Sequence, residues 1–198
     1  MKRNSFTLIE ILGVMVIITI LATLGFAGYS YAQNKSRESA TQGLITRLNA
    51  AFEFARQKTG FIPPTEVSDN VVNFATIEID PAGAKLSVAI LNSTRKDDYI
   101  LAAAATGKNK MYSEFYKHFV KALEMDTMGR FMDGNKIVDA WGNPVYYRYP
   151  GVIKKGGFDL ISAGSDGGFG TNTADTPSAS LTDYRDGAEW ICDDIANF

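Results

Sequence analysis

The residues with the clearest potential for chemistry lie in an acidic segment at the C-terminal end of the chain. Residues 159–198 contain eight acidic side chains and one basic side chain, Arg185, whereas residues 1–158 carry 19 basic and 14 acidic side chains. A glycine-rich segment with this excess of negative charge needs a counter-charge if it is to fold tightly. Carboxylates and loop carbonyls without a Cys or His cluster are hard oxygen ligands, which favour Ca²⁺ over zinc or copper. The sequence therefore predicts a Ca²⁺ site, and the alternative is a solvated acidic tail without a metal.

A single carboxylate, Glu10, interrupts an otherwise uncharged apolar run over residues 6–32. As a helix with a rise of 1.5 Å per residue, this run is long enough to cross the roughly 30 Å hydrocarbon core of a membrane. Lys2 and Arg3 precede the run, so the positive-inside bias predicts a cytoplasmic N-terminus, with the C-terminal part of the chain on the far side of the membrane. The sequence therefore predicts one transmembrane helix.

Glu10 needs a positively charged partner at its depth in the membrane. Insertion of a carboxylate into hydrocarbon costs about 2.5–3.5 kcal/mol, which is why such residues are rare and are treated as functional by default. If residues 1–5 are removed, the free amine of Phe6 on a neighbouring subunit becomes the natural partner. The alternative is that Glu10 lies among the lipid head groups at the cytoplasmic end of the helix.

Several functional classes find little support in the sequence. The chain has one cysteine, Cys192, so no intrachain disulfide is possible. The one histidine, His118, has no neighbouring Cys or second His, and residues 107–110 (GKNK) lack the upstream glycine of a phosphate-binding loop. No nucleophile and base stand together, so we expect no enzymatic activity. The net charge of −2, which becomes −4 without the two basic residues in 1–5, does not indicate nucleic-acid binding.

The apolar helix is expected to continue beyond the membrane. Apolar residues recur at spacings of three and four, and charged residues lie mostly off that stripe. The stripe consists of Ala40, Leu44, Leu48, Ala51, Phe52 and Ala55. Gly60, Pro63 and Pro64 end the pattern. We predict one helix over residues 6–59, about 80 Å long at 1.5 Å per residue.

A β-hairpin is predicted in the C-terminal half. Residues 145–149 and 158–162 are β-favouring runs on either side of a turn region at 150–157. Residues 141–144 (WGNP) form the turn that enters the hairpin. Its apolar face is expected to pack on the second half of the long helix.

The middle of the chain gives weaker signals. Residues 73–80 are expected to be extended, and residues 81–92 and 97–107 are each expected to hold a short helix. Residues 111–126 predict an amphipathic helix, because apolar residues recur at four-residue steps. The expected fold is therefore α+β: a long N-terminal helix packed against a small antiparallel β-sheet, with a loop-rich acidic tail.

The boundary between MKRNS and FTLIE resembles the processing site of type IV prepilins and type II secretion pseudopilins. In these families a prepilin peptidase cuts on the cytoplasmic side of the membrane, and the new N-terminal Phe is methylated. The resemblance implies cleavage between Ser5 and Phe6 and N-methylation of Phe6, with Ser5 standing where the family usually has Gly. It also implies that the amine of Phe6 pairs with Glu10 of a neighbouring subunit during filament assembly.

Two further segments resemble the major, G-type pseudopilins of type II secretion. Residues 139–144 read D-A-W-G-N-P where the family has D-P-W-G-N-P, and residues 159–167 read D-L-I-S-A-G-S-D-G, which matches D-L-x-S-x-G-x-D-G. The disulfide that closes the tail of many type IVa pilins is absent here, so the tail must be held in another way.

This second resemblance also implies a ligand set for the calcium site. Major pseudopilins bind one Ca²⁺ through the Asp of the G-x-D-G turn, the carbonyl three residues before it, and two acids near the C-terminus. Carried over by position, these are Asp166, the carbonyl of Ala163, and Asp193 and Asp194. Asp175 is a further candidate ligand.

The resemblances imply a structural role. The chain is expected to be an inner-membrane subunit that polymerises into a periplasmic filament of the type II secretion system and drives protein export. Its expected partners are copies of itself, the prepilin peptidase, the minor pseudopilins and the inner-membrane assembly platform. The alternatives are a type IV or competence pilin-like filament subunit, and a membrane-anchored periplasmic binding module.

The expected organisation follows from these segments. We expect a prepilin leader at 1–5, a transmembrane and polymerisation half of the helix at 6–33, and a periplasmic pilin-like domain at 34–198. Within this domain we expect a helix at 34–59, a variable αβ region at 60–136, a hairpin region at 137–165 and an acidic, candidate calcium-binding loop at 166–198.

Overall fold

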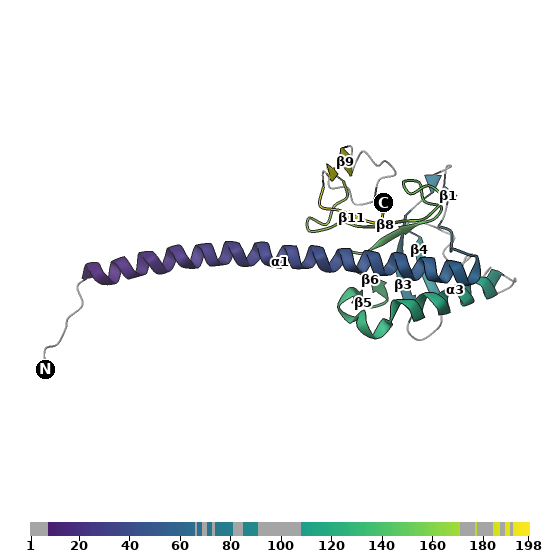
Figure 1. Ribbon diagram of the computed structural model, residues 1–198, viewed down its shortest axis with the longest axis horizontal. Coiled ribbons are helices and arrows are strands. Elements are labelled where there is room, and N and C mark those ends of the chain that lie inside the picture. Colours follow the sequence, from purple (N-terminus) through teal and green to yellow (C-terminus); the bar gives the residue numbers. More distant parts are fainter. Residues whose placement is uncertain are drawn as a thin grey trace. The chain divides into compact units, whose positions relative to one another are not determined.

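The longest element of the computed structural model is helix α1, Leu8–Thr59 (Figure 1). The structure describes residues 8–65, 67–68, 71–72, 74–80, 85–90, 108–170, 177, 184–186, 189–190 and 192–198. The predicted C-terminal end of the helix at Thr59 is confirmed. Gly60 closes the helix with a positive φ of 67°, and its N–H donates to the carbonyl of Arg56 at 2.7 Å.

The chain divides into two compact units at Arg37. In the first unit, every side chain of α1 that the structure describes is exposed, and most of these side chains are large and apolar. Among the described helices, α1 is the one long and apolar enough to cross a membrane. The first unit thus has the length and composition of the predicted transmembrane helix.

In the second unit, residues 38–198, one aromatic side chain of α1 lies at the centre of the core. The ring of Phe52 stacks on that of Tyr147 with 4.7 Å between centroids, and it lies 4.7 Å from Phe119 and 5.0 Å from Phe158. Such aromatic pairs contribute about 0.5–1.5 kcal/mol each beyond the area they bury. The predicted stripe is confirmed, since five of its members are almost fully buried: Leu44, Leu48, Ala51, Phe52 and Ala55.

An antiparallel sheet forms the other side of this core. Its strands lie in the order β11-β8-β7-β3-β6-β5, with β4 also paired to β3. The strands are β3 Ala75–Asp80, β4 Lys85–Ile90, β5 Met132–Asp133, β6 Lys136–Ile137, β7 Tyr146–Arg148, β8 Asp159–Ser162 and β11 Ile195–Ala196. Two separate pairs are β1 Val67–Ser68 with β2 Val71–Val72, and β9 Arg185–Asp186 with β10 Glu189–Trp190. The predicted α+β fold is confirmed.

The predicted amphipathic helix over 111–126 is confirmed as α3, Lys108–Leu123, which is followed by the short 3₁₀ helices η1, Met125–Thr127, and η2, Gly129–Phe131. Phe115, Phe119 and Leu123 are fully buried. The guanidinium of Arg47 on α1 donates to the carbonyl of Leu123 at 2.7 Å, which satisfies an otherwise unpaired group at the C-terminus of α3.

The predicted hairpin is confirmed by strands β7 and β8. Tyr147 pairs with Leu160, and Arg148 pairs with Asp159. The C-terminal strand β11 adds to the other side of β8, where Ile195 pairs with Ser162. The acidic tail therefore ends beside the hairpin and forms one edge of the sheet.

The prediction of a short helix over residues 81–92 is wrong. Residues 85–90 form β4, which pairs with β3 along its whole length, from Ala75 opposite Ile90 to Asp80 opposite Lys85. The sequence KLSVAI alternates larger apolar residues with small or polar ones, which is the two-residue period of a strand. The extended segment predicted over 73–80 is confirmed by β3, and the helix predicted over 97–107 lies outside the described residues.

Candidate functional site

A carboxylate from the acidic tail caps the turn that follows strand β8. Oδ2 of Asp193 accepts hydrogen bonds from the backbone N–H of Ser165 at 2.5 Å, from its hydroxyl at 2.7 Å, and from the N–H of Asp166 at 3.0 Å. Oδ1 of Asp166 accepts the N–H of Gly168 at 2.9 Å, which shapes the same turn. The negative charge of Asp193 is therefore met by backbone and hydroxyl donors.

A glycine is required where the tail meets this turn. Gly164 has a φ of +69°, a region that side-chain-bearing residues rarely adopt. A Cβ atom at this position would overlap the backbone carbonyl of Asp193. The glycine of the G-S-D-G segment thus permits both the turn and the close approach of the tail.

Asp194, the next residue of the tail, is buried and only partly satisfied. Its Oδ2 accepts the N–H of Gly170 at 2.6 Å, whereas its Oδ1 is buried and has no hydrogen-bond partner among the residues that the structure describes. Burial raises the pKa of Asp194 to about 6, and the nearby charges of Asp193 and Asp166 act in the same direction. A positive ion beside Oδ1 would relieve this unfavourable environment.

The lone thiol beside these acids is not suited to metal binding. Burial, together with the side chain of Asp194, raises the pKa of Cys192 to about 12. Cys192 therefore stays a neutral thiol at physiological pH, and it is placed 3.7 Å from the carbonyl of Tyr184. Oxygen atoms are the remaining donors at this site.

The candidate calcium ligands are placed together only in part. Asp166, Asp193 and Asp194 lie close enough for direct contact or mutual electrostatic influence, and the buried residue Ala163 directly precedes the turn. In the part of the chain that the structure describes, no three His, Cys, Asp or Glu side chains are arranged so that they could hold a metal ion. Asp175 lies outside the described residues. The donor atoms are oxygens, the type that a hard cation prefers, but the described side chains do not form a metal-binding cluster.

A buried polar network that the sequence reasoning missed supports the acidic turn. Asp139 is 1 % exposed; its Oδ1 accepts the N–H groups of Trp141 and Asn143, both at 2.8 Å, and its Oδ2 accepts the hydroxyl of Ser162 at 2.6 Å. The side-chain amide of Asn143 donates to the carbonyl of Gly164 at 2.8 Å. The sequence did contain a signal for this network: an Asp directly before the turn residues WGNP is typical of an Asx turn, in which the Asp side chain accepts backbone N–H groups of the turn.

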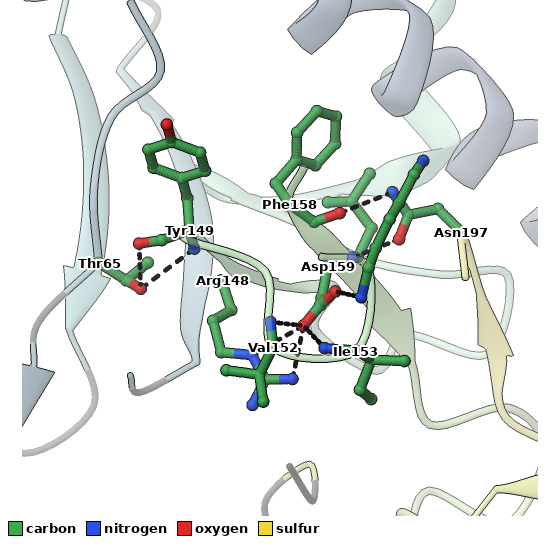
Figure 2. Close-up of polar contacts among 10 residues, drawn as sticks. Thr65, Arg148, Tyr149, Val152, Ile153, Phe158, Asp159 and Asn197 are labelled. Atoms are coloured by element: carbon green, nitrogen blue, oxygen red, sulfur yellow. Dashed lines mark hydrogen bonds and ion pairs between the residues drawn. The ribbon is translucent and has the colours of Figure 1, made fainter. Parts of the chain in front are cut away.

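Asp159, which the sequence analysis counted among the acids in need of a counter-charge, has its own buried partners. Figure 2 shows its carboxylate between Arg148 and the loop at 150–157. Its Oδ2 accepts hydrogen bonds from Nε and Nη2 of Arg148, at 2.9 and 2.5 Å. The same oxygen accepts the backbone N–H groups of Val152 and Ile153, and Oδ1 accepts the backbone N–H of Lys154. Both side chains of the ion pair are almost completely buried. Asp159 is thus an anchor of the hairpin loop.

The amide of Asn197 holds the tail to the sheet and to α1, again without a signal in the local sequence. Its Oδ1 accepts the N–H of Leu160 at 2.8 Å, and its Nδ2 donates to the carbonyl of Phe158 at 3.1 Å (Figure 2). The same Nδ2 donates to Oδ1 of Asn49 on α1 at 3.1 Å. These contacts, together with strand β11, hold the tail of a chain that has one cysteine.

The remaining predicted site residues belong to the N-terminal part of the chain. Ser5 and Phe6 lie outside the described residues. Glu10 lies in the first turn of α1 and is exposed. His118 lies with its ring 6.1 Å from that of Phe54, in an edge-to-face arrangement, as expected for a packing residue.

Comparisons with known protein families give one match at the N-terminus of the chain and one in its C-terminal half. A family model described as "Type II secretion system (T2SS), protein G" matches residues 119–178, and one described as "Prokaryotic N-terminal methylation motif" matches residues 1–26. Type II secretion system core protein G of Pseudomonas aeruginosa is 28% identical over 176 residues, which cover 88% of this chain and 93% of that protein. No solved structure gives a significant match.

Proposed function

Because this chain is a G-type major pseudopilin with a prepilin-like N-terminus, and so a structural subunit of the type II secretion pseudopilus, we propose that it polymerises through α1 into a periplasmic filament that drives protein export. The observation that supports this most is the first part of α1, which presents large apolar side chains and one carboxylate, Glu10, on an exposed surface. Such a surface is stable in a membrane or against other copies of the same helix.

The N-terminus supports a specific orientation and set of partners. Lys2 and Arg3 favour a cytoplasmic N-terminus, and the methylation-motif match over residues 1–26 supports removal of residues 1–5 by a prepilin peptidase. Cleavage would give Phe6 a new α-amine, which we propose pairs with Glu10 of the neighbouring subunit. The minor pseudopilins and the inner-membrane assembly platform are the other proposed partners.

Processing and secretion together test this function. We expect mass spectrometry of the mature protein to find N-methylated Phe6 as the first residue, and deletion of the gene to remove the exported proteins from the culture medium. Restoring the gene should restore export. A mature protein that keeps MKRNS and stays monomeric, or a deletion that leaves the secretome unchanged while abolishing adhesion or DNA uptake, would contradict the proposal.

We further propose that the acidic tail binds one Ca²⁺. The ligands would be the carboxylates of Asp166, Asp193 and Asp194 and the carbonyl of Ala163, with Asp175 as a further candidate. Support comes from the all-oxygen donor set and from the buried Oδ1 of Asp194, which has no hydrogen-bond partner in the described part of the chain. The ion would supply the positive charge that these carboxylates lack, and so hold the tail against the turn at 164–167.

Melting curves of the full chain in detergent micelles test the calcium site. At about 100 times the dissociation constant, Ca²⁺ should stabilise the fold by about 2.7 kcal/mol relative to EDTA, a shift of about 5–10 °C for a domain of this size. Asp194→Asn and Asp166→Asn should each remove most of this shift. The matched control is Asp133→Asn, the same charge change at an exposed site on β5, the opposite edge of the sheet.

The effect of calcium should also depend on pH. Since the pKa of Asp194 is raised to about 6, protons compete with the metal below that pH, and the calcium-dependent shift should become smaller as the pH falls from 7 to 5. Identical melting curves with Ca²⁺ and with EDTA at pH 7 would rule out the metal site.

A further inference from the structure

Asn143 makes a contact that the proposed function does not explain. It lies between strands β6 and β7, and its Nδ2 donates to the carbonyl of Gly164 at 2.8 Å. The two residues are 21 positions apart in the chain. The same side chain lies 3.6 Å from the position that a Cβ of Gly167 would occupy. Asn143 therefore lies against the turn at 164–167 from the side of the WGNP segment.

Buried residues fix the position of Asn143. Its backbone N–H donates to Oδ1 of Asp139, whose Oδ2 accepts the hydroxyl of Ser162. The N–H of Ala140, which follows Asp139 in the chain, donates at 3.1 Å to the hydroxyl of Thr41. Thr41 lies on α1 and is fully buried. The WGNP segment is thus attached both to strand β8 and to the helix, so Asn143 projects from a rigid support.

The turn that Asn143 contacts holds the acidic tail. Directly after Gly164, the N–H groups of Ser165 and Asp166 both donate to Oδ2 of Asp193. These two donors are correctly aimed only while the turn keeps its shape, because hydrogen bonds weaken steeply as they bend. A shift of the Gly164 carbonyl would turn the following N–H groups away from the tail.

We propose that Asn143 is a positioning residue: by holding the Gly164 carbonyl, it aims the N–H groups of Ser165 and Asp166 at Asp193 and sets the arrangement of the acidic ligands. The docking of the tail does not depend on a metal, whereas the effect on calcium affinity rests on the calcium site proposed above. The side-chain amide of Asn143 is partly buried; it satisfies the carbonyl of Gly164 and so selects one conformation of the turn.

Hydrogen exchange of the full chain in detergent micelles, without calcium, tests the metal-independent part. Asn143→Asp keeps the shape of the side chain but replaces the N–H donor with an acceptor that faces the Gly164 carbonyl. We expect exchange in peptides that span residues 164–167 to become at least about tenfold faster, the equivalent of 1.4 kcal/mol. Asn143→Ser, which is too short to reach the carbonyl and introduces no charge, should give the same result if the first variant does not fold.

Thr65→Val is the matched control. Thr65 is buried, and its hydroxyl donates to the carbonyl and accepts the N–H of Tyr149, so the variant loses comparable hydrogen bonds away from the acidic turn (Figure 2). It should leave exchange at 164–167 unchanged. Unchanged exchange there in both Asn143 variants, or an equal increase over the whole domain, would overturn the positioning role.

Calorimetric titration with Ca²⁺ tests the second part. The dissociation constant of the Asn143→Asp variant should be about tenfold higher than that of the wild type, and that of Thr65→Val should be unchanged. A wild type that binds no Ca²⁺ would overturn the metal site alone, and the exchange result would still decide the role of Asn143. A wild type and an Asn143→Asp variant with equal affinity would overturn the effect on the ligands.

Discussion

Replacement of Glu10 with Val is expected to leave the chain in the membrane and to abolish filament formation. Removing a carboxylate from the span makes insertion more favourable, by about 2.5–3.5 kcal/mol on insertion scales, so loss of assembly could not be attributed to failed insertion. The proposed charge pair between Glu10 and the amine of Phe6 would be lost. That amine would then have to enter the filament core without a partner, which is strongly unfavourable in a medium of low dielectric constant.

Membrane fractionation and electron microscopy of filaments from overproducing cells measure the two outcomes separately. Glu10→Gln, which keeps the size and removes the charge, should fail in the same way as Glu10→Val. Thr19→Val is the matched control, because it replaces a polar side chain of the same helix whose hydroxyl donates to the carbonyl of Met15 within the helix. Normal filaments from Glu10→Val would show that the charge pair is not needed.

The second large effect is expected at the buried ion pair between Arg148 and Asp159. Arg148→Met should lower the free energy of unfolding by about 3–5 kcal/mol, because it leaves the Asp159 carboxylate buried without its cationic partner. The guanidinium also lies 4.0 Å above the ring of Phe74, a contact that methionine would only partly replace. For a domain of this size the expected fall in melting temperature is about 6–20 °C.

A surface ion pair gives the comparison for this variant. Arg56 and Glu53 approach to 3.4 Å on an exposed face of α1, so Arg56→Met removes an arginine from an ion pair without leaving a buried charge. Its expected cost is below about 1 kcal/mol. Thermal melting of the full chain in detergent measures both variants. Equal small shifts would mean that the backbone N–H groups around Asp159 satisfy its charge without Arg148.

The parts of the fold that the sequence predicts correctly are those with a signal in neighbouring residues, either periodicity or β-favouring composition. The stripe around Phe52 on α1 repeats at 3.6 residues, so its buried face can be read without knowing its partner. The two runs of the β7–β8 hairpin are recognised as β-favouring residues on either side of a turn. Strand β4 has a two-residue period over its six residues, although a short helix was predicted over 81–92. The alternation was the better guide, because strand pairing overrides helix propensity.

The support of the acidic turn could not be predicted in the same way, because its partners are far apart in the chain. Asp139 and Ser162 are separated by 23 residues, and Leu160 and Asn197 by 37. The sequence shows only that negative charge accumulates, and it suggests a cation as the remedy. In the structure, backbone N–H groups satisfy Asp193, and Arg148 with the adjoining loop satisfies Asp159, so much of the charge is balanced before any ion is considered.

The strand, the carboxylates and the amide that close the sheet edge all belong to the final six residues of the chain. A polypeptide that stops a few residues early lacks the edge strand, the cap of the turn and the amide contacts at once. The edge strand, the cap of the acidic turn and the amide contacts therefore depend together on six consecutive residues, so they are gained or lost as one unit.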